Sequence, residues 1–227
     1  MSGFFREEDR GFRSTPVVSG LLAVTGLLAV ARTLAPGLEG VLGGLAPRTG
    51  FWQPFTASLM HGWPGVPALP HWGLNAVLMV AAGRPAERLL GSGRMALLAL
   101  SAAAANAVAV ALTEGVNGSS LILWSFGPPL AVALAEARRL DPGAAGGSLH
   151  GRILGVLVVM YVVITAAMTV LAYASGWRGD PGTAFVRGNL FHLTAAAVGV
   201  VYAAVWRGFI RRRLVYSGPV GGEGAAP

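Results

Sequence analysis

The chain has no cysteine, no lysine and few charged residues of any kind. Only 12% of its 227 residues are charged, against about a quarter in soluble domains. The absence of cysteine excludes a disulfide, a thiolate nucleophile and a thiolate metal site, so covalent catalysis would have to use a hydroxyl. The four histidines are scattered along the chain without metal-ligand spacing, and the sequence therefore predicts no metal site.

Apolar residues take the place of the missing charge. They make up 54% of the chain, and the mean hydropathy is +0.61. Since a membrane-spanning helix needs roughly 20 apolar residues, a chain of this length holds several spans and little else. The sequence predicts an all-α membrane protein with one membrane domain, over residues 16–213. The six expected spans are at about 16–35, 71–89, 95–112, 118–137, 153–174 and 189–206.

The segments outside the spans differ in character. Residues 1–15 are polar and charged, which is typical of a cytoplasmic N-terminal segment. Residues 36–70 are rich in Gly, Pro and aromatic residues, and Trp and Phe favour the membrane interface, so we expect an outer interfacial loop. Residues 214–227 are rich in Gly, Ala and Pro, which predicts a disordered C-terminal tail.

The basic residues indicate an orientation. With the N-terminus in the cytoplasm, 13 of the 17 arginines fall on the inner side. The outer side keeps Arg32, Arg48, Arg178 and Arg187. This division fits the positive-inside rule, whereas the opposite topology violates it. The net charge of +7 therefore records orientation, with both termini cytoplasmic, and gives no support to nucleic-acid binding.

In this topology three even-numbered spans begin at the outer side, and each carries a polar residue close to its start. His71 and Asn75 lie four residues apart in the second span, so they share a helix face. Ser120 opens the fourth span and His192 the sixth. Polar groups inside a membrane are costly and often functional. The plainer interpretation, for His71 and Asn75 taken alone, is a hydrogen-bonded pair that holds neighbouring helices together.

A serine becomes a nucleophile when a base lies within hydrogen-bond reach and when donors await the charge that develops on the attacked carbonyl. Ser120 and His192 fit the first requirement as a dyad. No acid lies in the outer halves of the spans, which argues against a triad. His71, Asn75 and the backbone N–H of Ser120 are the candidate oxyanion donors.

Four short motifs follow one another along the chain. They are HxxxN at His71–Asn75, a Gly-Glu-Gly turn from Gly83 through Glu87 to Gly93, GxSx at Gly118–Leu121, and a last-span motif from His192 to Gly199. Each is weak alone, but their order and helix positions resemble the rhomboid family of intramembrane serine proteases. The resemblance covers the chain from Trp52 to the end of the sixth span. Gln53, Leu121 and Ala195 depart from the family pattern, which has Arg, Gly and Gly there.

The resemblance implies a six-transmembrane-helix rhomboid-like bundle that cuts transmembrane protein substrates near the outer face, without metal or cofactor. Carried over, Ser120 is the nucleophile, His192 the base, and His71 and Asn75 stabilise the oxyanion. The supporting residues are Gly118, which opens the nucleophile motif, Trp124, which packs on the histidine one turn below the serine, and small Ala195 and Gly199, which let the sixth helix approach the fourth.

Several alternatives stay open at this point. Ser119 also follows a glycine, although only Ser120 satisfies the family spacing. A catalytically inactive rhomboid-like protein that binds transmembrane helices would share the fold. A small-solute transporter is motivated by the break at Gly127–Pro129. In each case we expect a multi-pass protein of the cell membrane, in a bacterium the plasma membrane, in contact with the lipid bilayer and either monomeric or a homo-oligomer.

Overall fold

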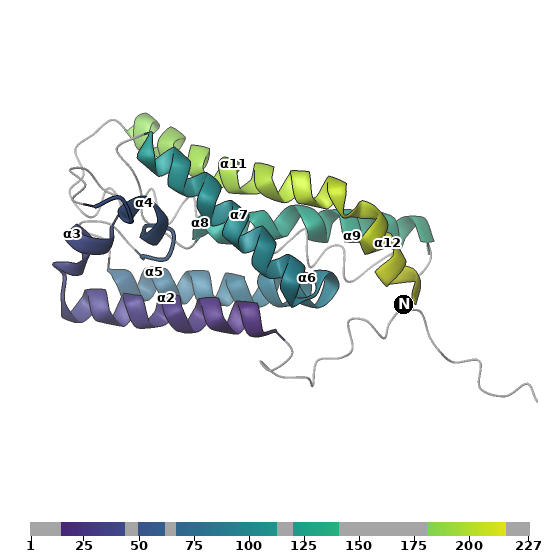
Figure 1. The fold of residues 1–227 in the computed structure, drawn as a ribbon, viewed down its shortest axis with the longest axis horizontal. Coiled ribbons are helices and arrows are strands. Elements are labelled where there is room, and N and C mark those ends of the chain that lie inside the picture. The colour runs from purple at the N-terminus through teal and green to yellow at the C-terminus, as the bar shows by residue number, and fades with distance from the viewer. Residues whose placement is uncertain (1–14, 44–49, 62–66, 113–119, 141–180, 217–227) are drawn as a thin grey trace, which may run out of the picture.

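The computed structural model describes residues 15–43, 50–61, 67–112, 120–140 and 181–216, and all regular structure in these ranges is helical. Long helices pack side by side, with the short helices α3 and α4 at one end of the bundle and α12 at the other (Figure 1). The fifth expected span, 153–174, lies outside the described residues, as do the segments 1–15 (apart from Thr15) and 217–227.

The first expected span is α2, Pro16–Leu34. Proline suits the first turn because its missing N–H would have no intrahelical partner there. The N-terminus of α2 is held by Glu87 of α6, whose buried carboxylate accepts hydrogen bonds from the backbone N–H groups of Val17 (3.0 Å) and Val18 (2.8 Å). The Ser92 hydroxyl donates a third bond to the same carboxylate (2.8 Å). A carboxylate at a helix N-terminus also stabilises the helix dipole.

The expected outer loop is folded on itself and contains two short helices, α3 (Leu38–Leu42) and α4 (Gln53–Thr56). Three side chains in and next to α4 donate hydrogen bonds to backbone carbonyls of α3: Trp52 to Val41, Gln53 to Gly40 and Thr56 to Leu42, at 2.6–2.8 Å. Phe51 and Phe55 are exposed, which suits contact with the membrane interface.

The second expected span is a continuous helix made of α5 (Ala68–Leu78), the π-helical turn η2 (Met79–Gly83) and α6 (Arg84–Leu90). It starts at 68, whereas we expect 71, because Pro70 falls in the first turn, where proline is tolerated. The helix ends at Gly91, whose φ of 81° is a left-handed conformation that suits glycine. The next helix, α7 (Ser92–Ala111), follows at once, so the expected start at 95 is three residues late.

The fourth expected span is an α-helix interrupted by a 3-10 turn. It consists of α8 (Ser120–Leu123), the 3-10 turn η3 (Trp124–Phe126) and α9 (Gly127–Leu140). Pro128 and Pro129 fall in the first turn of α9, where they cost no intrahelical hydrogen bond, and the preceding turn tightens instead. α9 ends three residues beyond the expected 137.

The last expected span is longer than predicted and turns sharply at its end. α11 runs from Pro181 to Val205, so it begins eight residues before 189, and α12 runs from Arg207 to Tyr216. The segments His192–Val205 and Arg207–Val215 are bent by 63°. Because α12 continues to Tyr216 and Leu214 is buried, the boundary at 213 between domain and disordered tail is three residues too early.

Two described helices, α2 and α7, are long and apolar enough to cross a membrane, and a third is added if the bent α11–α12 pair counts as one span. Large apolar side chains on these helices face outward, as lipid contact requires: Leu27, Leu34, Leu100, Leu112 and Val205 are each at least 69% exposed. The chain is therefore a helical membrane protein. The six-span arrangement and the orientation stay predictions.

The main core lies between α2, the α5–α6 helix, α7, α8, α9 and α12. Its largest members, each less than 2% exposed, are Met79, Leu89, Leu90, Met95, Leu98, Leu123, Phe126 and Ile210. α8 is surrounded by α5, η2, α7 and α11, so the start of the broken fourth helix lies at the centre of the bundle.

Candidate active site

The contact that defines the site joins Trp124 to His192. Their ring centroids are 5.2 Å apart and the ring planes are tilted by 34°. His192 is 8% exposed. Ser120 lies four residues before Trp124, which is about one helical turn toward the N-terminus of α8. The backbone of Ser120 is therefore one turn away from the residue that packs on His192. The Ser120 hydroxyl lies outside the described atoms, as do Gly118, Ser119 and the Leu121 side chain.

The close approach of α11 to η3 depends on Gly199. A Cβ atom built there would clash with the carbonyl oxygen of Ser125 and would lie 3.0 Å from Cγ of Pro128. Ala195, one turn nearer to His192, has no exposed surface. Two small residues on one face of α11 thus bring His192 close to the broken fourth helix.

His71 and Asn75 lie on α5, buried at 5% and 1% exposure, and α5 contacts α8. His71 is near enough to His192 for their charges to interact. The side-chain nitrogen and oxygen of Asn75 have no hydrogen-bond partner among the described residues. Because an unsatisfied buried amide costs free energy, this arrangement suits a group that serves a bound substrate.

A further group of polar residues extends from His71 to the outer loop, and the sequence did not single it out. His61, 1% exposed, packs edge-on against His71 with ring centroids 5.7 Å apart. The guanidinium of Arg32 donates to the His61 carbonyl oxygen (2.7 Å) and is paired with Glu39, with Nε 2.9 Å from Oε2. The C-terminal end of α2 therefore fixes the loop that covers His71.

The charge state of His61 follows from its surroundings. Burial, with smaller contributions from the positive charges of His71 and Arg32, lowers the pKa of His61 to about 3. The ring is therefore neutral near pH 7 and can accept or donate a hydrogen bond without carrying charge. The one sequence signal for this group is an arginine near the end of an apolar span with an acid seven residues later.

The helices that carry six of the eight expected site residues contact one another around the fourth helix, α8–η3–α9: these residues are His71, Asn75, Trp124, His192, Ala195 and Gly199. Ser120 is included through its backbone, and Gly118 lies outside the described residues. Within the described ranges no group of three His, Asp or Glu side chains could hold a metal ion.

Comparison with protein-family models, with curated proteins and with solved structures finds no match to this chain. The functional interpretation consequently rests on the residues and their geometry.

Proposed function

We propose that the chain is a rhomboid-type intramembrane serine endopeptidase, in which Ser120 is the nucleophile and His192 the general base. The observation that carries the proposal is the ring contact between Trp124 and His192, one helical turn from the Ser120 backbone. A packed indole restricts the imidazole to a narrow range of orientations, which a base needs if it is to accept a proton from one particular hydroxyl.

The proposed reaction uses this chain's groups in sequence. The Ser120 hydroxyl attacks the scissile carbonyl while His192 takes its proton. The negative charge that forms on the carbonyl oxygen is stabilised by donors from His71, Asn75 and the Ser120 N–H. His192 then gives the proton to the departing amine, and water releases the acyl group from Ser120 by the same route. The unsatisfied, buried amide of Asn75 supports its role as a donor.

The proposed setting is a six-span bundle with both termini in the cytoplasm, in the plasma membrane of a bacterium. Ser120 begins α8 and His71 lies in the first turn of α5, whereas His192 lies eleven residues after the start of α11. In this setting all three lie below the outer surface, so the proposed substrates are transmembrane proteins cut near that face. The arginine distribution supports this orientation.

Labelling with a fluorophosphonate probe and cleavage of a model transmembrane substrate test the proposal. We expect the wild-type protein to do both. Ser120→Ala and His192→Ala should lower each rate by at least about a thousandfold, since dyad members act as a unit. Ser119→Ala is the matched control and should keep both activities.

Undiminished labelling of Ser120→Ala would refute the assignment, and loss of labelling in Ser119→Ala alone would move the nucleophile by one residue. A folded wild-type protein that neither reacts nor cleaves, and that co-purifies with transmembrane helices, would be the inactive helix-binding protein instead.

A further inference from the structure

A charged cavity lies where α9 meets α12, at the far end of the bundle from α3 and α4 (Figure 1). Its volume is about 320 Å³, which is within the range of small-molecule sites. It is lined by Glu136, Arg139, Leu140, Arg207, Gly208 and Arg211. None of these residues belongs to the proposed dyad or its surroundings.

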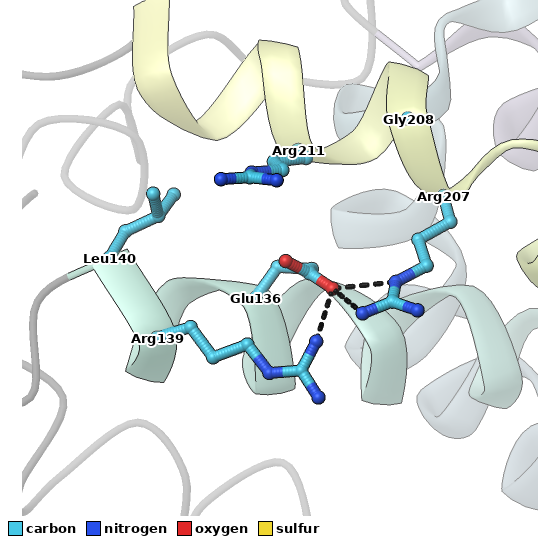
Figure 2. Close-up of a pocket in the computed structure, with 6 residues that line it drawn as sticks. All are labelled: Glu136, Arg139, Leu140, Arg207, Gly208 and Arg211. Carbon is cyan, nitrogen blue, oxygen red and sulfur yellow. Dashed lines mark hydrogen bonds and ion pairs between the residues drawn. The ribbon is translucent and has the colours of Figure 1, made fainter.

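Glu136 organises the arginines of this cavity. Its carboxylate oxygen Oε1 accepts hydrogen bonds from Arg139 (3.0 Å) on its own helix and from Arg207 (2.7 Å) on α12, as Figure 2 shows. Glu136 is 4% exposed, so this ion pair joins α9 to α12 at a fixed place. The side chains of Arg139 and Arg207 stay 64% and 54% exposed, and each guanidinium has N–H donors that Glu136 does not use.

Arg211 adds a third positive charge. It projects from α12 over the same space in Figure 2 and has no hydrogen bond or ion pair with any residue that the structure describes. Three guanidinium groups against one carboxylate leave the cavity with a net charge of +2. Guanidinium groups held apart by a central carboxylate, with unused donors, suit a phosphate group, whose oxygens accept paired hydrogen bonds.

The position of α12 indicates where such a phosphate would come from. α12 is bent by 63° from the preceding apolar segment, buries Ile210 and Leu214, and exposes Arg211, Arg212 and Arg213. Its apolar side packs into the bundle core, so its strongly basic side is the one left exposed, where clustered arginines attract anionic lipid headgroups. Tyr202 and Trp206 lie just before the bend, with ring centroids 4.5 Å apart and ring planes tilted by 43°. Aromatic residues at such a place are typical of the headgroup layer.

We infer that this cavity binds the phosphate of an anionic phospholipid headgroup, in the inner leaflet under the proposed topology. Basic pockets between helices at the cytoplasmic side are suited to such headgroups. Arg139, Arg207 and Arg211 bind the phosphate, and Glu136 positions the first two of them. The inference is independent of proteolysis, because it rests on the opposite end of the bundle.

The test uses the purified full chain in an uncharged detergent, with short-chain phosphatidylglycerol as the probe and the rise in unfolding temperature as the measure of binding. We expect stabilisation by phosphatidylglycerol and none by phosphatidylcholine at equal concentration. Arg211→Gln should weaken the apparent Kd about fivefold. Arg139→Gln should have a similar effect. Arg212→Gln removes the same charge from an exposed neighbour outside the cavity and should change the Kd by less than about twofold.

Equal weakening by Arg211→Gln and Arg212→Gln would overturn the site, since only diffuse surface charge would then be at work. Equal stabilisation by phosphatidylcholine would also overturn it. Inorganic phosphate forms the last arm: stabilisation as strong as that by phosphatidylglycerol would make a soluble phosphate the ligand and overturn the assignment to lipid.

Discussion

At the scale of single residues, Trp124 is the best test of how the proposed base is held. Trp124→Ala removes the ring that packs on His192, and an aromatic pair contributes about 0.5–1.5 kcal/mol beyond its buried area. We therefore expect fluorophosphonate labelling of Ser120 to slow by roughly two- to tenfold. Trp124→Phe keeps a ring and should retain most of the rate.

Time courses of labelling at a fixed probe concentration measure this effect. A Trp124→Ala rate equal to that of the wild type would show that the imidazole needs no support from the indole.

His61 makes a prediction about pH. Burial lowers its pKa to about 3 from an ordinary value of 6.5, so the folded state favours the neutral ring. The stabilisation is complete above pH 6.5 and is lost progressively as the pH falls from 6.5 toward 3, because the unfolded chain gains a proton that the folded chain does not. His61→Gln should remove this part of the pH dependence.

Unfolding temperatures in detergent between pH 7 and pH 4 provide the measurement. His150→Gln is the control, since the sequence predicts a solvated loop there, and it should leave the pH profile unchanged. If the His61→Gln variant loses as much stability as the wild type between pH 7 and pH 4, His61 does not have the role given to it.

At the scale of helices, the fit of α11 against η3 determines whether the site can form. Gly199→Val places a branched side chain where even a Cβ would clash with the Ser125 carbonyl oxygen. Overpacking of this kind costs about 1–3 kcal/mol or more, so the unfolding temperature should fall. Labelling at Ser120 should fall by more than about tenfold, because α11 also carries His192.

Ala197→Val is the matched control, since Ala197 lies two residues away on the exposed side of the same helix. It should leave the unfolding temperature and the labelling rate close to wild type. If Gly199→Val behaves like Ala197→Val, the close contact between α11 and η3 is not required.

Within the described residues, the sequence predicted well where helices lie, because long apolar runs have few other uses. Some boundary errors fell near prolines: Pro70, Pro128 and Pro181 each lie inside the first turn of a helix, although proline is commonly taken as a boundary. The early start of α7 at Ser92 involves no proline. The π-helical turn at Met79–Gly83 had no signal in the sequence. Gly83, at the end of this turn, packs against Val18 and Phe126, where a Cβ would lie 3.0 Å and 3.5 Å from their side chains.

The candidate site residues could be predicted where their spacing lies on one helix. Contacts between two separate segments could not be predicted. His71 with Asn75, and His192 with Gly199, are readable as spacings on single helices. Two ion pairs join separate segments: Arg32–Glu39, beside His61, and Glu136–Arg207. The spacing of residues along the chain does not show how such segments are rotated relative to each other.

At the scale of the whole molecule, the topology can be tested directly because the chain has no cysteine. Any cysteine introduced is then the sole target for a maleimide that cannot cross the membrane. In intact cells Ser175→Cys should be labelled from outside, whereas Ser148→Cys should be labelled only after permeabilisation. Both positions lie in segments that the sequence predicts as loops on opposite sides.

Labelling of both cysteines in intact cells, or of Ser148→Cys alone, would contradict the six-span arrangement with cytoplasmic termini. Each variant should be shown to unfold at the wild-type temperature, so that exposure reflects topology rather than damage.

The π-helical turn in the second long helix affects how the two ends of that helix are rotated relative to each other. Asn75 precedes the turn and Glu87 follows it, and both side chains are 1% exposed. An α-helix rotates by about 100° per residue, so deletion of Val80 would turn one end relative to the other by about that angle. One of these side chains would then leave the bundle interior. The widened turn therefore sets the rotation between the two ends, and a single helix supplies buried polar side chains on both sides of the turn.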